Sequence, residues 1–310
     1  MRGPTKISVL ICTYNRSQSL GVAVESVAAQ SLPQSLDWEI LIIDNNSPDQ
    51  TRQVVEDLQH RYPNHIRYVF EPQQGVSHAR NAGIREARGE ILAFLDDDET
   101  ASKDWLQNLT ANLHNGEWAG AGGRVLPPSS FSPPRWLSTK SSFANGPLAA
   151  FDLGLVAGQL SEPAFGANMA FRREVFDKYG GFRTDLGRAG KSMISNEDTE
   201  FGRRLMAAGL RLRYEPSALT YHPVEANRLQ KEYFLNWWFS KGRSDIRELG
   251  NQPNSKRFLG VPLPLFRALP WVAMRWVFAV EPPKRFSYKL QVWNCVGQIY
   301  ESYRQWLATG

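Results

Sequence analysis

Three consecutive aspartates, Asp96-Asp97-Asp98, follow a short apolar segment and form the most distinctive chemical group in the chain. Like charges this close repel one another and raise each other's pKa. A divalent cation removes the repulsion, and hard Mg²⁺ or Mn²⁺ prefers carboxylate oxygens. Because such a cation usually holds one or two protein carboxylates together with substrate phosphates, the cluster predicts a metal-bound diphosphate. The alternative is a solvated acidic turn in which Asp98 or Glu99 begins a helix.

Polar residues follow two other apolar segments in the first half of the chain. Segment 7–12 runs into Thr13-Tyr14-Asn15-Arg16, and segment 39–44 ends at Asp44. A carboxylate at one strand end is weak evidence, because it commonly caps the next helix. Three polar strand ends that meet at one edge of a sheet favour a polar pocket instead.

The segments between these polar ends alternate between strand and helix patterns. The predicted strands cover 7–12, 39–44, 66–70 and 91–95, and the predicted helices cover 17–30, 47–60 and 76–87. Ser17 is a candidate cap of the first helix. This βαβα order predicts an α/β fold, a Rossmann-like and mostly parallel sheet flanked by helices, with ligands beyond the carboxyl ends of the strands.

The second half of this region continues with a long loop and further elements. We expect a Pro- and Ser-rich loop over 127–147, a strand over 164–172, a helix up to Tyr179, a helix over 197–208 capped by Ser195 or Asn196, and a strand over 210–221. The loop is interpreted as a lid, an acceptor platform or a passive connection.

Several protein classes are excluded by what the chain lacks. It contains neither G-x-G-x-x-G after the first strand nor G-x-x-x-x-G-K-[ST], which argues against a nicotinamide dehydrogenase and a P-loop NTPase. Two cysteines are too few for a disulfide scaffold or a Cys-rich zinc site. No apolar run reaches roughly 18 residues, and the apolar run that follows residue 6 is too short for a signal peptide. The expected location is therefore cytoplasmic.

An ordered set of motifs resembles family 2 glycosyltransferases with a GT-A fold, of the type found in bacterial glycan biosynthesis. The motifs are Val9–Arg16, Ile42–Ser47, Gly75–Gly83, Ala93–Asp98, Phe165–Arg172, Phe176–Phe182 and Asn196–Asp198. Each motif alone is weak, but the ordered set is specific and spans roughly residues 6–223.

The resemblance implies a role for individual positions on the donor side. It places Thr13, Asn15 and Arg16 in the loop that lines the nucleotide pocket, Asp44 at the nucleobase, and Gly75 and Arg80 near the diphosphate. Asp96 and Asp98 match the two aspartates of the D-x-D motif, the first near the ribose and the second on the metal, and Asp97 is its variable middle residue. His222 is implied as a further metal or phosphate contact. The implied base is typically uracil. His222 could equally be a structural histidine.

The resemblance also implies that Asp198 is the catalytic base, and Glu197 beside it is the competing candidate. Inverting transfer needs one base to take the proton of the acceptor hydroxyl, and positive charge to stabilise the departing diphosphate. A helix start would hold Asp198 rigidly, although the helix dipole would make it a weaker base.

We therefore expect an inverting, metal-dependent hexosyltransferase of polysaccharide biosynthesis. It would transfer a sugar from a nucleoside diphosphate donor, a UDP-sugar by family resemblance, to a hydroxyl of a glycan or lipid-linked acceptor, with Mg²⁺ or Mn²⁺ as cofactor. The alternatives are a sugar-phosphate nucleotidyltransferase and a non-catalytic relative that binds nucleotide or glycan. A nucleic-acid partner is a poor fit because no recognised motif is present.

The carboxyl-terminal region differs from the rest in charge and in aromatic content. Residues 231–310 hold 12 Lys/Arg and 5 Asp/Glu, net +7, whereas residues 1–230 hold 24 and 26, net −2. The region also contains six of the ten Trp. We expect a catalytic domain over 1–230, with a nucleotide-binding half at 1–125 and an acceptor-side half at 126–230, and a helical extension over 231–310.

Two interpretations of this basic, aromatic extension remain open. It could contact anionic lipid peripherally on the inner face of the cell membrane, or its aromatics could pack inward while its charges are solvated. One apolar stripe is apparent at helical spacing, formed by Phe286, Leu290, Trp293, Val296, Tyr300, Tyr303 and Leu307. Trp237-Trp238 is interpreted as an acceptor sugar platform or as core packing.

Overall fold

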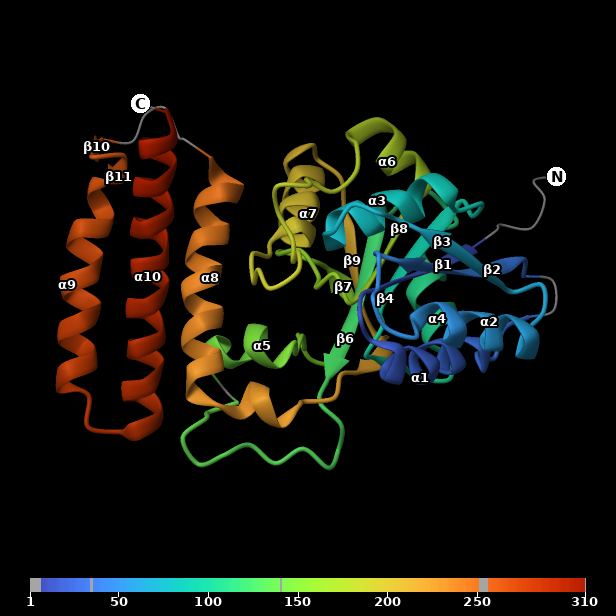
Figure 1. Ribbon diagram of the computed structural model, residues 1–310, viewed down its shortest axis with the longest axis horizontal. Coiled ribbons are helices and arrows are strands. Elements are labelled where there is room, and N and C mark those ends of the chain that lie inside the picture. Colours follow the sequence, from blue (N-terminus) through green and yellow to red (C-terminus); the bar gives the residue numbers. More distant parts are fainter. Residues whose placement is uncertain (1–6, 34–35, 140, 251–255, 310) are drawn as a thin grey trace. The chain divides into compact units, whose positions relative to one another are not determined.

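The computed structural model describes residues 7–33, 36–139, 141–250 and 256–309 (Figure 1). The chain forms two compact units. Unit 1 falls within Met1–Pro128, Ala149–Thr184 and Glu197–Pro223, and unit 2 falls within Ser129–Leu148, Asp185–Asn196 and Val224–Gly310. Residues 1–6, which precede the apolar run examined for a signal peptide, lie outside the described residues.

Unit 1 is built from strands and helices that alternate along the chain. Its strands are β1 (Ile7–Thr13), β2 (Trp38–Asp44), β3 (Ile66–Phe70), β4 (Ile91–Asp96), β5 (Thr100–Ala101), β6 (Gly120–Leu126), β7 (Gly158–Gln159), β8 (Asn168–Arg172) and β9 (Leu212–Tyr221). Its helices are α1 (Ser17–Ala28), α2 (Thr51–Arg61), α3 (Val76–Glu86), α4 (Trp105–Thr110), α6 (Arg173–Tyr179) and α7 (Glu197–Ala207). The βαβα pattern expected for residues 7–95 is confirmed.

The strands of unit 1 form one large sheet in the order β3-β2-β1-β4-β8-β6-β9-β5, and β7 pairs with β9. Strands β3, β2, β1 and β4 run parallel to one another, and β6 runs parallel to β9. Strand β8 lies between β4 and β6 and runs antiparallel to both. The fold is thus the expected α/β fold with a mostly parallel sheet.

The sheet separates two apolar cores because its strands are apolar on both faces. In β1, Ile7, Val9 and Ile11 point to one core while Leu10 points to the other. Helices α1, α2 and α4 cover the first face, and α3, α6 and α7 cover the second (Figure 1). Continuous burial of a strand on both faces is typical of parallel sheets between helices.

Two local expectations in the sequence were wrong. The cap of α1 is Arg16, and Ser17 is already helical. The backbone N–H of Ser17 is instead bound by Oδ2 of Asp49 at 3.0 Å, so a carboxylate from the loop before α2 satisfies this free helix-end donor. The loop expected over 127–147 also contains a helix, α5 (Ser142–Leu148), in which Pro147 is tolerated near the end.

Unit 2 is mainly helical, as expected for its carboxyl-terminal part. It contains α5, a 3₁₀ turn η1 (Ala226–Leu229), α8 (Lys231–Leu249), the short strands β10 (Arg257–Phe258) and β11 (Val261–Pro262), α9 (Leu263–Phe278) and α10 (Pro282–Thr309). Helix α10 packs against both α8 and α9 (Figure 1). Among the described residues, no helix has the length and apolar character needed to cross a membrane.

Glycines bring α8 and α10 into backbone contact. A Cβ at Gly242 would overlap the carbonyl of Asn294, and one at Gly297 would overlap the carbonyl of Phe239. One turn beyond Gly297, Glu301 is fully buried against α8. Around Gly297 the backbones of α8 and α10 therefore approach closely, while Phe286 and Tyr300 of α10 make ring contacts with Phe234 and Phe239 of α8.

The apolar stripe of α10 is only partly covered. Leu290 is buried, but Val296, Tyr300, Tyr303 and Leu307 are exposed. The inward-packing interpretation is thus wrong for this half of the stripe. Inward packing describes Trp237 and Trp238 better. Trp237 lies against Gly146, and Trp238 donates its indole N–H to the Phe143 carbonyl at 3.0 Å.

Candidate active site

The polar strand ends of the parallel half meet at one edge of the sheet. Register pairs Thr13 of β1 with Asp44 of β2, and Cys12 of β1 with Asp96 of β4. Three segments distant in sequence thus end side by side. This places the loop after β1 between the acidic ends of its two neighbours.

Asp44 is held firmly at this edge. It is buried, its Oδ2 accepts the Tyr68 hydroxyl at 2.8 Å, and its Oδ1 accepts the Ser47 backbone N–H at 2.9 Å. The Arg52 guanidinium covers the Tyr68 ring, 4.2 Å from its centroid. Because a carboxylate has about four acceptor positions and these two bonds occupy two of them, Asp44 retains capacity for a further donor on each oxygen.

Asn45 is a residue of this edge that the sequence interpretation missed. Its Nδ2 donates to the carbonyls of Glu71 at 3.1 Å and Gln73 at 2.6 Å, and its Oδ1 accepts the Gly75 N–H at 2.7 Å. Gly75 has φ 142°, which favours glycine. One buried amide therefore shapes the segment that leads into α3, and its position directly after a buried strand was the available signal.

The loop after β1 is fixed to the loop after β2. Asn15 has φ 54°, a left-handed conformation that Asn tolerates, and its N–H donates to Ser47 Oγ at 3.0 Å. Thr13 is buried at the strand end and Tyr14 is exposed. This turn presents Arg16 to the acidic cluster.

The acidic cluster is neutralised by groups of the chain itself. Arg16 Nη1 lies 2.7 Å from Asp98 Oδ2, and Arg16 Nε lies 3.8 Å from Asp97 Oδ1. Burial, reinforced by the charge of Asp98, raises the pKa of Asp97 to about 8, so its protonated form is favoured near neutral pH. The repulsion inferred from three adjacent aspartates is therefore relieved by a distant arginine, and the raised pKa of Asp97 acts in the same direction.

His222 joins this cluster from the end of β9. Its ring is almost fully buried, with Nε2 3.5 Å from Asp98 Oδ2. Its backbone N–H donates to Leu126 at 2.9 Å, which fixes the residue beside β6. Its Nδ1 has no hydrogen-bond partner among the described residues.

A divalent metal could take only a few ligands from this chain. Among the described residues, no three His, Cys, Asp or Glu side chains gather as a metal-binding group. Asp98 with His222 would provide two, and substrate phosphate and water would have to supply the rest. The carboxylate of Asp98 fits Mg²⁺ or Mn²⁺ bound chiefly through a diphosphate, and the imidazole of His222 would be a secondary contact.

Arg80 links the strand edge to α7. It is buried, with Nη1 2.6 Å from Glu197 Oε1 and Nη2 3.5 Å from Asp96 Oδ1. Its guanidinium also lies 5.5 Å from the ring centroid of Phe182. Burial alone would lower the pKa of Arg80, but Glu197 and Asp96 hold it above its ordinary value. Arg80, implied near a diphosphate, thus already has two carboxylate partners.

Glu197 and Asp198 differ sharply in environment. Glu197 is buried and ion-paired; burial and the charge of Asp198 raise its pKa, while Arg80 acts in the opposite direction. Asp198 is half-buried, and its oxygens accept the N–H groups of Gly166 at 2.6 Å and Thr199 at 2.7 Å. Asp198 is therefore the carboxylate of the pair that is oriented yet accessible.

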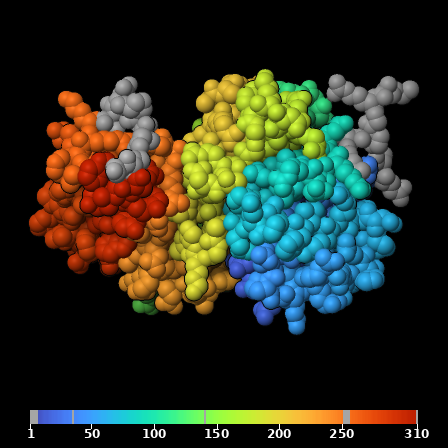
Figure 2. Space-filling model, turned by 45° about the horizontal axis from the view of Figure 1, so that its top comes forward, coloured from blue at the N-terminus to red at the C-terminus, as the bar shows by residue number. Residues whose placement is uncertain are grey.

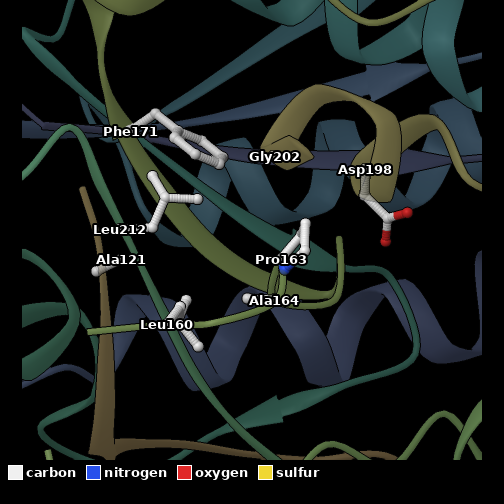
Figure 3. A pocket seen from close by; sticks show the side chains of 8 residues that line it. All are labelled: Ala121, Leu160, Pro163, Ala164, Phe171, Asp198, Gly202 and Leu212. Atoms are coloured by element: carbon white, nitrogen blue, oxygen red, sulfur yellow. The ribbon is translucent and has the colours of Figure 1, made fainter. Parts of the chain in front are cut away.

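A small, mostly apolar cavity borders Asp198. It is lined by Ala121, Leu160, Pro163, Ala164, Phe171, Asp198, Gly202 and Leu212. Figure 3 shows the Asp198 carboxylate at its margin, turned away from the apolar side chains. The polar chemistry of the site accordingly lies on the other side of Asp198, toward Gly166 and Arg80.

Two groups of expected site residues are brought together by direct contacts. One is Arg16 with Asp97, Asp98 and His222, and the other is Arg80 with Asp96 and Glu197 beside Asp198. Asp44 lies at the same strand edge because it pairs with Thr13, and Gly75 is held there because its N–H donates to Asn45 Oδ1.

Comparison with known proteins gives a consistent result. The model of Glycosyl transferase family 2 matches residues 8–180. The Succinoglycan biosynthesis protein ExoM of Rhizobium meliloti (strain 1021) is 29% identical over 252 residues, covering 81% of this chain and 77% of the relative. The Glucosyl-dolichyl phosphate glucuronosyltransferase of Haloferax volcanii is 28% identical over 255 residues, covering 78% of each chain.

The fold is also similar to that of a solved structure. The mannosyltransferase PcManGT from Pyrobaculum calidifontis, in complex with GDP-Man and Mn²⁺, superposes with a TM-score of 0.60 at 19% identity. The match covers 99% of this chain and 76% of that one. At this identity the likeness establishes the GT-A fold.

Proposed function

This chain belongs to glycosyl transferase family 2, and we propose that it is an inverting, metal-dependent hexosyltransferase that uses Asp198 as its base. The donor would be a nucleoside diphosphate sugar, a UDP-sugar by family resemblance, and the acceptor a hydroxyl of a glycan or lipid-linked glycan. The observation that carries this proposal is the contact chain from Asp96 through Arg80 to Glu197 beside Asp198. It ties the edge where a donor would bind to the carboxylate that would act on an acceptor.

On the donor side, we assign the nucleoside to the edge formed by the loops after β1 and β2. Asp44 would accept a hydrogen bond from the base, and Asp96, whose side chain is 43% exposed, would contact the ribose. Thr13, Asn15 and Gly75 would shape the pocket, and Asp97 would remain a buried support. Arg16 would turn from Asp98 toward the phosphates.

The proposed cofactor is Mg²⁺ or Mn²⁺, held by Asp98 and His222 together with the diphosphate. When bound, it would neutralise the negative charge of the leaving diphosphate. The Mn²⁺ complex of PcManGT supports this assignment by its fold likeness alone.

On the acceptor side, Asp198 would take the proton of the attacking hydroxyl while the oxygen of that hydroxyl bonds to the anomeric carbon. The bond from that carbon to the diphosphate breaks in the same step, so the configuration inverts. Glu197 is a poorer base because it is buried and already paired with Arg80. We assign it a positioning role: it fixes Arg80 and the start of α7.

Residues 1–230 would carry this reaction, with a donor half at 1–125 and an acceptor half at 126–230. Residues 231–310 would form an extension that contacts anionic membrane peripherally, at the inner face where lipid-linked acceptors occur. Polysaccharide biosynthesis is the setting suggested by the name of the Rhizobium meliloti relative.

The donor can be identified without an acceptor. A thermal-shift panel of nucleoside diphosphates and nucleotide sugars, with and without Mn²⁺, should give one nucleotide whose stabilisation needs the metal. Asp98→Ala should abolish this metal-dependent shift. The control Glu162→Gln, an exposed carboxylate of the same unit, should leave it unchanged. Equal shifts for Asp98→Ala and the unmodified protein would remove Asp98 from the metal site.

A further inference from the structure

Helix α9 presents an apolar face to solvent. None of its residues, all within the described range 256–309, is buried. Its exposed positions are Leu263, Pro264, Phe266, Arg267, Pro270, Trp271, Met274, Arg275, Val277 and Phe278, and all but the two arginines are apolar. Trp271 is 57% exposed, Phe278 75%, and Val280 just beyond the helix 93%.

This face is unusual for a helix that packs on one neighbour. A surface helix normally turns charged or polar residues to water, opposite its apolar stripe. The side of α9 that packs against α10 is apolar as well, and the only charged residues in the helix are Arg267 and Arg275. A contiguous exposed apolar surface of this kind marks a contact with a partner.

The charge around α9 is almost entirely positive. Residues 256–309 hold eight Lys/Arg and two Asp/Glu. One of the two acids, Glu301, is fully buried in the ion pairs with Arg243, Arg247 and Arg304. The surface formed by these residues, coloured orange to red in Figure 2, therefore has one exposed acid, Glu281, among the described residues.

Basic side chains lie beside aromatic rings on this surface. The Arg275 guanidinium is 4.6 Å from the ring centroid of Tyr288 and 5.9 Å from that of Trp271. Lys289 Nζ lies 5.3 Å from the Trp293 ring centroid. Aromatic rings together with basic side chains are typical of helices that lie in the interface of an anionic bilayer.

We infer that the outward face of α9 inserts into the interfacial region of an anionic lipid bilayer, with α9 parallel to the membrane surface. The helix has 16 residues and contains Pro270 and two arginines, which fits a helix that lies on a membrane. This inference rests on the membrane contact proposed for residues 231–310 and names the surface that makes it. It does not depend on which nucleotide sugar is the donor.

A second copy of the chain fits this face less well. In a symmetric contact the arginines of one α9 would face those of the other, and no acid of α9 could pair with them. An anionic bilayer supplies both an apolar layer for Trp271 and phosphates for Arg267.

Vesicle co-sedimentation of the full chain tests this inference. Vesicles of phosphatidylcholine alone are compared with equimolar phosphatidylcholine and phosphatidylglycerol. Trp271→Glu with Phe278→Glu should weaken binding to the anionic vesicles by about tenfold or more. The matched control, Leu155→Glu with Val156→Glu, changes two apolar residues of unit 1 that are at least as exposed, and should bind as the unmodified chain does.

A variant that removes basic residues separates the electrostatic contribution to vesicle binding from the apolar one. Arg267→Gln, Lys284→Gln and Arg285→Gln together should reduce binding to anionic vesicles and its salt dependence. The thermal midpoint and the nucleotide-dependent shift of every variant should stay unchanged, which distinguishes this test from a failure of the proposed transferase.

Three results would overturn the inference. The first is no binding of the unmodified chain to anionic vesicles at low salt. The second is equal loss of binding in the unit 1 control. The third is a stable dimer, found by light scattering without lipid, that the Trp271→Glu and Phe278→Glu variant converts to monomer, because α9 would then be covered by a second copy.

Discussion

Glu301→Gln should destabilise unit 2, because Glu301 is fully buried and bound by three arginines. Its oxygens lie 2.9 Å from Arg243 Nε, 2.8 Å from Arg247 Nε and 2.5 Å from Arg304 Nη2. Burial opposes the charged form, but these hydrogen bonds lower the pKa of Glu301 from 4.5 to about 2. At about 1.4 kcal/mol per pKa unit, the charge contributes about 3 kcal/mol to stability at neutral pH.

The pH dependence of this contribution has a defined sign. Because the pKa of Glu301 is lower in the folded chain, the stabilisation is complete above pH 4.5 and is lost as the pH falls toward 2. About 2 kcal/mol of it should be gone at about pH 3. Urea unfolding of the unmodified chain and of Glu301→Gln, followed at neutral pH and at about pH 3, measures the difference directly.

Glu281→Gln is the matched control, since Glu281 is an exposed carboxylate at the start of α10. It should change the free energy of unfolding by less than about 0.5 kcal/mol at either pH. A difference between Glu301→Gln and the unmodified chain that is near zero at neutral pH, or that stays constant down to pH 3, would refute the assigned ion cluster.

Two further predictions concern the candidate active site. Arg16→Gln should tighten Mn²⁺ binding in the absence of nucleotide by about tenfold, because the guanidinium no longer competes for Asp98. An electron paramagnetic resonance titration measures this affinity, and weaker binding would contradict the role of Arg16. Gly166→Ala should lower the free energy of unfolding by about 1–3 kcal/mol, because the added Cβ would lie 2.6 Å from Arg80 Nη2. It should also slow sugar transfer, because the Gly166 N–H that binds Asp198 would be displaced. Unchanged stability and an unchanged rate would contradict this packing.

The parallel half of unit 1 could be predicted from sequence because its signals are local. Runs such as Ile7–Cys12 are buried on both faces, so the apolar pattern alone identifies the strand. The residue after each run then falls at the shared edge, whatever the register.

The partners of the acidic residues could not be predicted in this way. Arg16 reaches Asp98 across 82 positions, and Arg80 reaches Glu197 across 117. Which distant arginine neutralises a carboxylate depends on sheet register and helix placement, which no local pattern encodes. The position of Asn45 after a buried strand marked it as a polar strand end, but its role was not predictable, since the three hydrogen bonds of its side chain all go to the segment 71–75.

The carboxyl-terminal helices show where helical periodicity gives the wrong face. The spacing of Val296, Tyr300 and Tyr303 correctly indicates one side of α10, but that side is exposed. In this half of α10, Gly297 and Glu301 meet α8 by close backbone approach and an ion cluster, while the half-exposed Tyr300 keeps a ring contact with Phe239 of α8.

Asp198→Asn offers the most direct test of the proposed reaction. Nucleotide binding is measured by metal-dependent thermal shift, and sugar transfer is measured on the donor that the panel identifies, with the product's anomeric configuration read by NMR. We predict unchanged nucleotide binding, transfer reduced by at least about a hundredfold, and an inverted product from the unmodified chain. Transfer by Asp198→Asn at the unmodified rate, or a product with retained configuration, would contradict the assignment of Asp198 as the base.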